Sequence, residues 1–194
     1  PLTLLVVTKD GEQTVTLPFA ERSRTWAIPV NAEPARVEID QGFRFLSNMT
    51  IEGSRKLLTA SLEDDGSVVG RIRAAKALAK DGSPRAIEAL ARALKNDPFW
   101  GVRAEIARML GKHGTPAART ALLAGLDDTH TKALAPIVDA LGHLPSHPDV
   151  LAALTGIAKN GHASLQVEGS AVRALGRLKA PGIIALALEV AERP

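Results

Sequence analysis

The chain has no cysteine, few aromatic residues and little net charge for its length. Its 194 residues include 2 tryptophans, 4 phenylalanines and 2 methionines, and the formal net charge is +3. Without cysteine the chain can form neither a disulfide nor a thiolate metal site, and the sequence does not indicate a redox compartment. The apolar content of 45% is sufficient for one or two soluble domains with apolar cores.

Long hydrophobic runs and basic clusters are also missing. The longest apolar run, at residues 182–190, is about half as long as a membrane-spanning helix requires. Nucleic-acid-binding surfaces usually cluster basic residues on one face, whereas Arg85, Arg92 and Lys95 would share their helix with Glu88 and later segments do not repeat the pattern. The sequence therefore predicts neither a membrane nor a nucleic-acid partner, and it favours a soluble, cytoplasmic protein.

Prolines recur at a nearly constant spacing in the second half of the chain. Pro84, Pro116, Pro148 and Pro181 follow one another at intervals of 32, 32 and 33 residues. Proline is favoured at the first position of a helix, and a preceding Ser or Thr can cap the free amides there. Each proline is therefore predicted to start a helix, and the spacing is typical of helical repeats.

A series of leucines runs in step with these prolines. Leu78, Leu110, Leu141 and Leu175 each precede a proline by six or seven residues, and apolar residues stand three and four positions before each leucine. This spacing gives each helix one buried stripe. For residues 51–194 we expect a HEAT-like α-solenoid of about four helix pairs plus an N-terminal half-repeat.

The first fifty residues follow a period of two instead, which is typical of strands. An Asp10-Gly11 turn signal lies between the first two runs. For residues 1–50 we expect four short antiparallel strands that form the end of a β-sandwich, with a fifth segment at Phe43 and Phe45 left open. Half a sandwich exposes an apolar face, so self-association through this β segment is a further expectation. The alternating runs are residues 2–7, 14–19, 25–30 and 37–39.

The histidines do not form a recognisable metal or catalytic pattern. None of the 5 histidines is followed by glutamate. His143 and His147 have i, i+4 spacing, but the prolines at 145 and 148 keep them off a common helical face. The sequence therefore predicts no catalytic residue, no metal ligand and no cofactor in this chain.

Two pairs of aspartates, at residues 64–65 and 127–128, lie in expected turns between repeats. In stacks of this kind an acidic turn residue commonly meets the arginine of the following helix. Asp97 ahead of Arg103 fits this arrangement, as does Asp65 ahead of Arg71. We interpret the pairs as structural contacts that align neighbouring repeats.

Phe99 and Trp100 are adjacent bulky aromatics in a chain that is poor in them. They are either a hot spot for a partner or a plug at the junction between repeats. We favour the plug because Pro98 is expected to start the following helix and the next residues continue its buried stripe.

Three segments together resemble the carboxy-terminal part of bacterial zinc aminopeptidases of the aminopeptidase N family. They are Thr25-Trp26-Ala27-Ile28-Pro29-Val30, Ala35-Arg36-Val37-Glu38-Ile39-Asp40 and Val68-Val69-Gly70-Arg71-Ile72-Arg73-Ala74-Ala75. In that family a β-sandwich is followed by a HEAT- or armadillo-like helical domain. Since the family's His-Glu-x-x-His zinc motif is absent, the resemblance implies a non-catalytic fragment of a longer chain, with zinc only in the catalytic domain of that parent.

The resemblance also implies partners and contact residues. The helical domain would pack against the parent's own catalytic domain and help to enclose its peptide substrate. A free-standing HEAT scaffold that binds another protein is the main alternative, and an enzyme built from such repeats, such as a bilin lyase or an alkyl-base glycosylase, is another. The polar residues expected on the concave wall are Arg85, Glu88, Arg92, Arg119 and Lys159.

Overall fold

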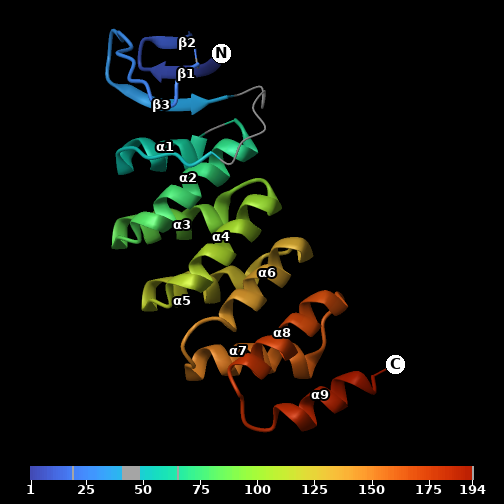
Figure 1. Cartoon of the computed structure of the whole chain (residues 1–194). Coiled ribbons are helices and arrows are strands. Elements are labelled where there is room, and N and C mark those ends of the chain that lie inside the picture. The colour runs from blue at the N-terminus through green and yellow to red at the C-terminus, as the bar shows by residue number, and fades with distance from the viewer. Residues whose placement is uncertain (19, 41–48, 65, 194) are drawn as a thin grey trace. The chain divides into compact units, whose positions relative to one another are not determined.

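The computed structural model describes residues 1–18, 20–40, 49–64 and 66–193. Three strands come first in these residues and helices follow them to the C-terminus (Figure 1). The chain divides into two compact units, residues 1–80 and 81–194. The change from strands to helices near residue 50 and the division between the units therefore fall at different places. Among the described helices, none is long and apolar enough to cross a membrane.

The strands of the first unit form an antiparallel sheet. They are β1 (Leu2–Thr8), β2 (Gly11–Leu17) and β3 (Pro34–Ile39), in the order β2-β1-β3. Thr8 pairs with Gly11, so the β1-β2 hairpin turns through two residues, Lys9 and Asp10. The hairpin expected at this turn signal is therefore present.

The strand expected at residues 25–30 does not form. These residues have no assigned secondary structure, and Pro29 has no N–H to donate to a neighbouring strand. The side chain of Trp26 is half-buried, and its Nε1 has no hydrogen-bond partner among the residues that the structure describes. The segment proposed at Phe43 and Phe45 lies outside the described residues.

Two helices, α1 (Arg55–Asp64) and α2 (Val68–Asp81), follow the sheet, and α1 packs against β3. Ser54 Oγ accepts a hydrogen bond from Leu57 N at 3.3 Å and so caps the start of α1. The Arg36 side chain on β3 forms ion pairs with Glu38 (2.8 Å) and with Asp64 (2.7 Å). The second layer that the sheet requires thus comes in part from α1.

The second unit is a stack of helices in two layers. The first layer contains α3, α5, α7 and α9, the second contains α4, α6 and α8, and successive helices within each layer are in contact. A short 3₁₀ helix, η1 (Gly125–Asp127), follows α5. The bounds are α3 Pro84–Asn96, α4 Trp100–His113, α5 Pro116–Ala124, α6 Thr131–Leu141, α7 Pro148–Asn160, α8 Leu165–Arg177 and α9 Ile183–Ala191.

Three of the four prolines start helices as predicted. Ser83 Oγ caps α3 by accepting from Ala86 N, Thr115 Oγ1 caps α5 in the same way, and His147 Nδ1 caps α7. Pro181 is different, because Gly182 adopts a left-handed conformation with φ of 73° and α9 begins after it.

Pro98 does not start α4 either. Asp97 Oδ1 accepts a hydrogen bond from Phe99 N at 2.8 Å, which closes a turn around Pro98. The helix therefore begins at Trp100, with Phe99 in an extended conformation before it.

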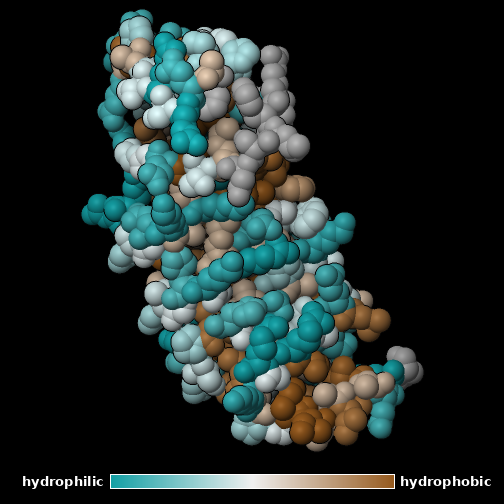
Figure 2. Space-filling view, viewed as in Figure 1, coloured by the Kyte–Doolittle hydropathy of each residue, from teal (hydrophilic) through white to brown (hydrophobic). Residues whose placement is uncertain are grey.

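The core of the stack consists of the predicted stripes. Leu110, Leu141 and Leu175 are each 0% exposed. Figure 2 shows apolar surface gathered towards the C-terminal end of the second unit, where Ile184 and Leu188 of α9 are 77% and 61% exposed.

The close contact between α6 and α8 gives a testable prediction about Gly142. A Cβ at this residue would lie 2.6 Å from Cα and Cβ of Ala174 on α8. Gly142→Ala should therefore lower the free energy of unfolding by about 2 kcal/mol. Gly156 inside α7 is the matched control, because a Cβ there meets no atom of a described residue within 4 Å. Gly156→Ala should raise that free energy by about 1 kcal/mol. Urea unfolding of both variants measures this difference, and a Gly142→Ala protein as stable as the original would contradict the packing.

Candidate functional site

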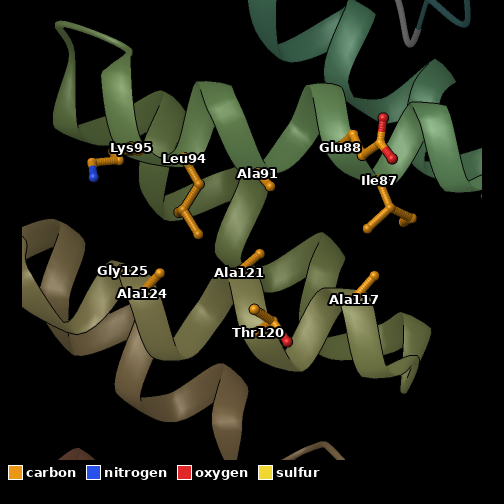
Figure 3. Close-up of a pocket in the computed structure, with 10 residues that line it drawn as sticks. All are labelled: Ile87, Glu88, Ala91, Leu94, Lys95, Ala117, Thr120, Ala121, Ala124 and Gly125. Atoms are coloured by element: carbon orange, nitrogen blue, oxygen red, sulfur yellow. The ribbon is translucent and has the colours of Figure 1, made fainter.

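A groove runs between α3 and α5, with a volume of about 380 Å³ (Figure 3). Five of its lining residues belong to α3 and four to α5, and Gly125 closes one end. The residues of α3 are Ile87, Glu88, Ala91, Leu94 and Lys95, and those of α5 are Ala117, Thr120, Ala121 and Ala124.

The local sequence explains why space remains between these two helices. Positions 117, 121 and 124 recur at helical spacing on one face of α5, and each carries only a methyl group. Ile87 and Leu94 on the facing helix are buried. The Thr120 hydroxyl donates to Pro116 O at 3.1 Å, so it is satisfied within its own helix. The groove is therefore mainly apolar along its length.

The two helices run in the same direction along the groove. Ile87 and Ala117, from the first turns of α3 and α5, lie at one end, and Leu94 and Ala124 lie at the other (Figure 3). The amino termini of both helices therefore lie on the same side. The partial positive charges of two helix dipoles are gathered at that side and the partial negative charges at the other.

One charged residue stands at each end of the groove. Glu88 lies near the amino-terminal ends of the two helices and Lys95 near their carboxy-terminal ends (Figure 3). Both are exposed, and neither has a hydrogen-bond or ion-pair partner among the residues that the structure describes. Seven residues of helix separate them by about 10 Å along the axis. The groove thus presents an apolar centre between a negative and a positive end.

The structure brings only one of the five predicted contact residues into this groove. Glu88 lines it, whereas Arg85 and Arg92 are exposed on α3 outside the lining and Arg119 is half-buried on α5. Lys159 lines a separate depression between α7 and α9, with a volume of about 280 Å³. The predicted residues therefore do not line a single depression, and their contact with a partner stays a prediction.

Sequence reasoning missed Lys95 and the alanines of α5 as groove residues. The helical spacing of Ala117, Ala121 and Ala124 was the available signal. Small residues at such spacing are equally typical of tight helix packing, so the pattern does not distinguish a groove from a filled interface.

An ion pair fixes the turns next to this groove. Arg103 of α4 donates from Nε and Nη2 to the Asp128 carboxylate at 2.6 and 3.0 Å, and from Nη1 to Asp97 O at 2.7 Å. His130 N donates to the same carboxylate at 2.8 Å. One guanidinium therefore ties together the turns that precede α4 and α6.

The protonation of this pair follows from its contacts. Burial raises the pKa of Asp128, but hydrogen bonds from Arg103 and from the His130 N–H outweigh burial, so its pKa lies below the ordinary range. The hydrogen bond to Asp128 raises the pKa of Arg103. The structural interpretation of the 127–128 pair holds for Asp128, although the arginine that it meets belongs to α4 and not to the following helix. The proposed pair of Asp65 with Arg71 lies partly outside the described residues.

Trp100, the first residue of α4, contacts the start of α6. The Trp100 ring stacks on His130 with centroids 5.5 Å apart, and Lys132 Nζ lies 5.2 Å from the ring centroid. Phe99 is 38% exposed and its ring centroid lies 5.3 Å from that of Trp100. Trp100 thus occupies the junction between two repeats, as the plug interpretation requires.

The structure places the histidines of the α6-α7 turn in separate local contacts. His143 Nε2 lies 3.5 Å from Asp139 Oδ2, and His147 Nδ1 accepts from Asp149 N. Among the described residues, no three His, Asp or Glu side chains are grouped closely enough to hold a metal ion.

Comparison with known proteins finds a family match over helices α1 to α6. Residues 55–142 match the family of HEAT repeats. The predicted fold class, a HEAT-like α-solenoid preceded by a small antiparallel sheet, is thereby confirmed.

A solved structure similar to this chain is that of human deoxyhypusine hydroxylase in complex with glycerol. Its TM-score is 0.60 and its sequence identity is 28%, and the match covers 67% of this chain and 45% of that one. This chain therefore spans less than half of the length of the hydroxylase. A comparison with curated protein sequences found no match.

These findings overturn the assignment to a zinc aminopeptidase, because both point to HEAT repeats and neither supports an aminopeptidase fragment. The first of the three segments behind the resemblance, residues 25–30, is not a strand. In the third, Ala74 and Ala75 are 0% exposed on α2, as the packing face of any such repeat requires. Three expectations rested on that resemblance alone and are no longer supported: zinc in a parent chain, a catalytic domain as partner and a substrate enclosed between them.

Proposed function

We propose that this chain is a HEAT-repeat scaffold that binds a segment of another protein in the groove between α3 and α5. The observation that carries the proposal is the groove itself, which is mainly apolar and has a charged residue at each end. Repeat arrays commonly use surfaces formed by successive equivalent helices for binding. A partner segment that covers the apolar lining gains free energy from the surface that both remove from water.

A substitution that fills the groove tests this proposal. Ala124 is exposed at one end of the lining, so Ala124→Trp should fill the space without disturbing the core. Peptides selected from a displayed library for binding to the full chain should bind this variant about tenfold or more weakly.

Ala152→Trp is the matched control, because Ala152 is exposed on α7 and does not line the groove. Fluorescence polarisation of the selected peptides measures both affinities, and urea unfolding shows that both variants are folded. Equal affinities for the two variants would place binding elsewhere and contradict the proposal.

A HEAT-repeat enzyme is the second candidate, supported by the likeness to deoxyhypusine hydroxylase. Incubation of the full chain with a deoxyhypusine-containing protein, followed by mass spectrometry, tests it. The gain of one oxygen atom on the substrate would favour this candidate over the scaffold.

A further inference from the structure

Building on the proposed function, we infer that the groove receives an amphipathic helix that runs antiparallel to α3 and α5. Its first turn carries an acidic residue that meets Lys95, and its last turn carries a basic residue that meets Glu88. Three independent features of the groove lead to this occupant: its apolar lining, the parallel direction of its two helices and the placement of its two charges.

The lining favours a helix over an extended strand. Residues within α3 and α5 bond their main-chain groups inside their own helices, so the groove offers no free edge with which a strand could pair. An extended segment would therefore leave its own N–H and C=O groups unpaired against alanine and leucine side chains. A helix satisfies these groups internally and presents only side chains to the groove. The methyl side chains of α5 leave room for such a close approach.

The direction of the occupant follows from the helix dipoles. Since the amino termini of α3 and α5 lie on the same side (Figure 3), a third helix is favoured when its carboxy terminus lies there. That orientation is antiparallel to both walls of the groove.

The two charges favour the same direction. In the antiparallel orientation Lys95 lies beside the first turn of the occupant and Glu88 beside its last turn. An acidic first turn and a basic last turn are also the charges that stabilise a helix by themselves. A parallel occupant would need the opposite charges, which would oppose its own dipole. The groove therefore selects both a charge pattern and a direction.

Two synthetic helices of identical composition test the inference. Each is a stapled peptide of leucine and alanine, one with Glu in the first turn and Lys in the last, the other with these two residues exchanged. The first should bind the full chain about tenfold more tightly, because two favourable charge pairs replace two unfavourable ones. Fluorescence polarisation measures the difference, which should narrow as salt is added.

Charge reversal in the protein should invert the preference. The double variant Glu88→Lys with Lys95→Glu should bind the second peptide more tightly than the first. Lys112→Glu is the matched control, since Lys112 is a basic residue in the last turn of α4 just as Lys95 is in α3. This control should leave the preference unchanged.

The outcomes separate the inference from the function on which it rests. Equal binding of both peptides that is lost in Ala124→Trp would overturn the charge pattern and direction while the scaffold function stands. Display-selected peptides that bind this groove when neither designed helix does would overturn the helical occupant alone. If neither designed helix binds and no library-selected peptide loses affinity in Ala124→Trp, both proposals are overturned.

Discussion

Replacement of Asp128 by alanine should lower the free energy of unfolding by about 3 kcal/mol. The side chains of Arg103 and Asp128 are 13% and 9% exposed, so the variant leaves a largely buried guanidinium without its carboxylate. It also removes the acceptor for His130 N. Urea unfolding measures the loss.

The neighbouring aspartate supplies the control for this prediction. Asp127 is exposed, and Asp127→Ala should change the free energy of unfolding by less than about 0.5 kcal/mol. Equal losses for the two variants would show that the ion pair does not hold the turns together.

The same ion pair should make the stability depend on pH. The pKa of Asp128 is lowered in the folded state. When the pH falls below about 4, the unfolded chain therefore binds more protons than the folded chain does. The contribution of Asp128 is therefore complete above that pH and is lost as the pH falls towards its folded-state pKa. The Asp128→Asn variant should show a shallower decline in stability over this acid range than the original protein.

Replacement of Leu141 by alanine should also lower the free energy of unfolding by about 3 kcal/mol. Leu141 is 0% exposed in α6, the helix that contacts both α4 and α8 in the second layer. The variant loses buried apolar surface and leaves a cavity that its neighbours fill only in part.

Leu188→Ala is the matched control, because the same atoms are removed from a side chain that is 61% exposed on α9. It should change the free energy of unfolding by less than about 0.5 kcal/mol. A similar loss for both variants, measured in urea, would contradict the placement of the core.

Much of the helical part could be predicted because its signals are local. Pro84, Pro116 and Pro148 begin helices through caps made by the residue before each proline. The leucine series identified buried positions, since a helix can turn only one stripe of its surface to the core. The same local rules did not apply at Pro98 and Pro181, where a side-chain turn and a left-handed glycine intervene.

The prediction of a strand at residues 25–30 and the assignment to a family were wrong for a different reason. An alternating pattern shows that a segment is compatible with a strand, but pairing depends on a neighbour that the pattern does not contain. In the same way, the arginine and alanine positions of residues 71–75 meet the needs of HEAT helices in general. They therefore did not distinguish one family of repeats from another.

The groove depends on how two helices lie side by side, which periodicity does not determine. Of the residues predicted from the sequence as contacts, Glu88 lines the groove. A charged residue on the Pro-initiated helix α3 could be predicted as a contact, but its place in the groove could not. The sequence indicates Lys95 only as one of the basic residues of that helix. Its role follows from its place opposite the end of α5, which is a property of the packing.

Amide NMR mapping of the full chain, titrated with a display-selected peptide, tests the central claim most directly. If the groove between α3 and α5 is the binding surface, the largest chemical-shift changes should fall on residues 87–95 and 117–125. Changes concentrated instead around Trp100 and His130, or around Lys159 and α9, would contradict it.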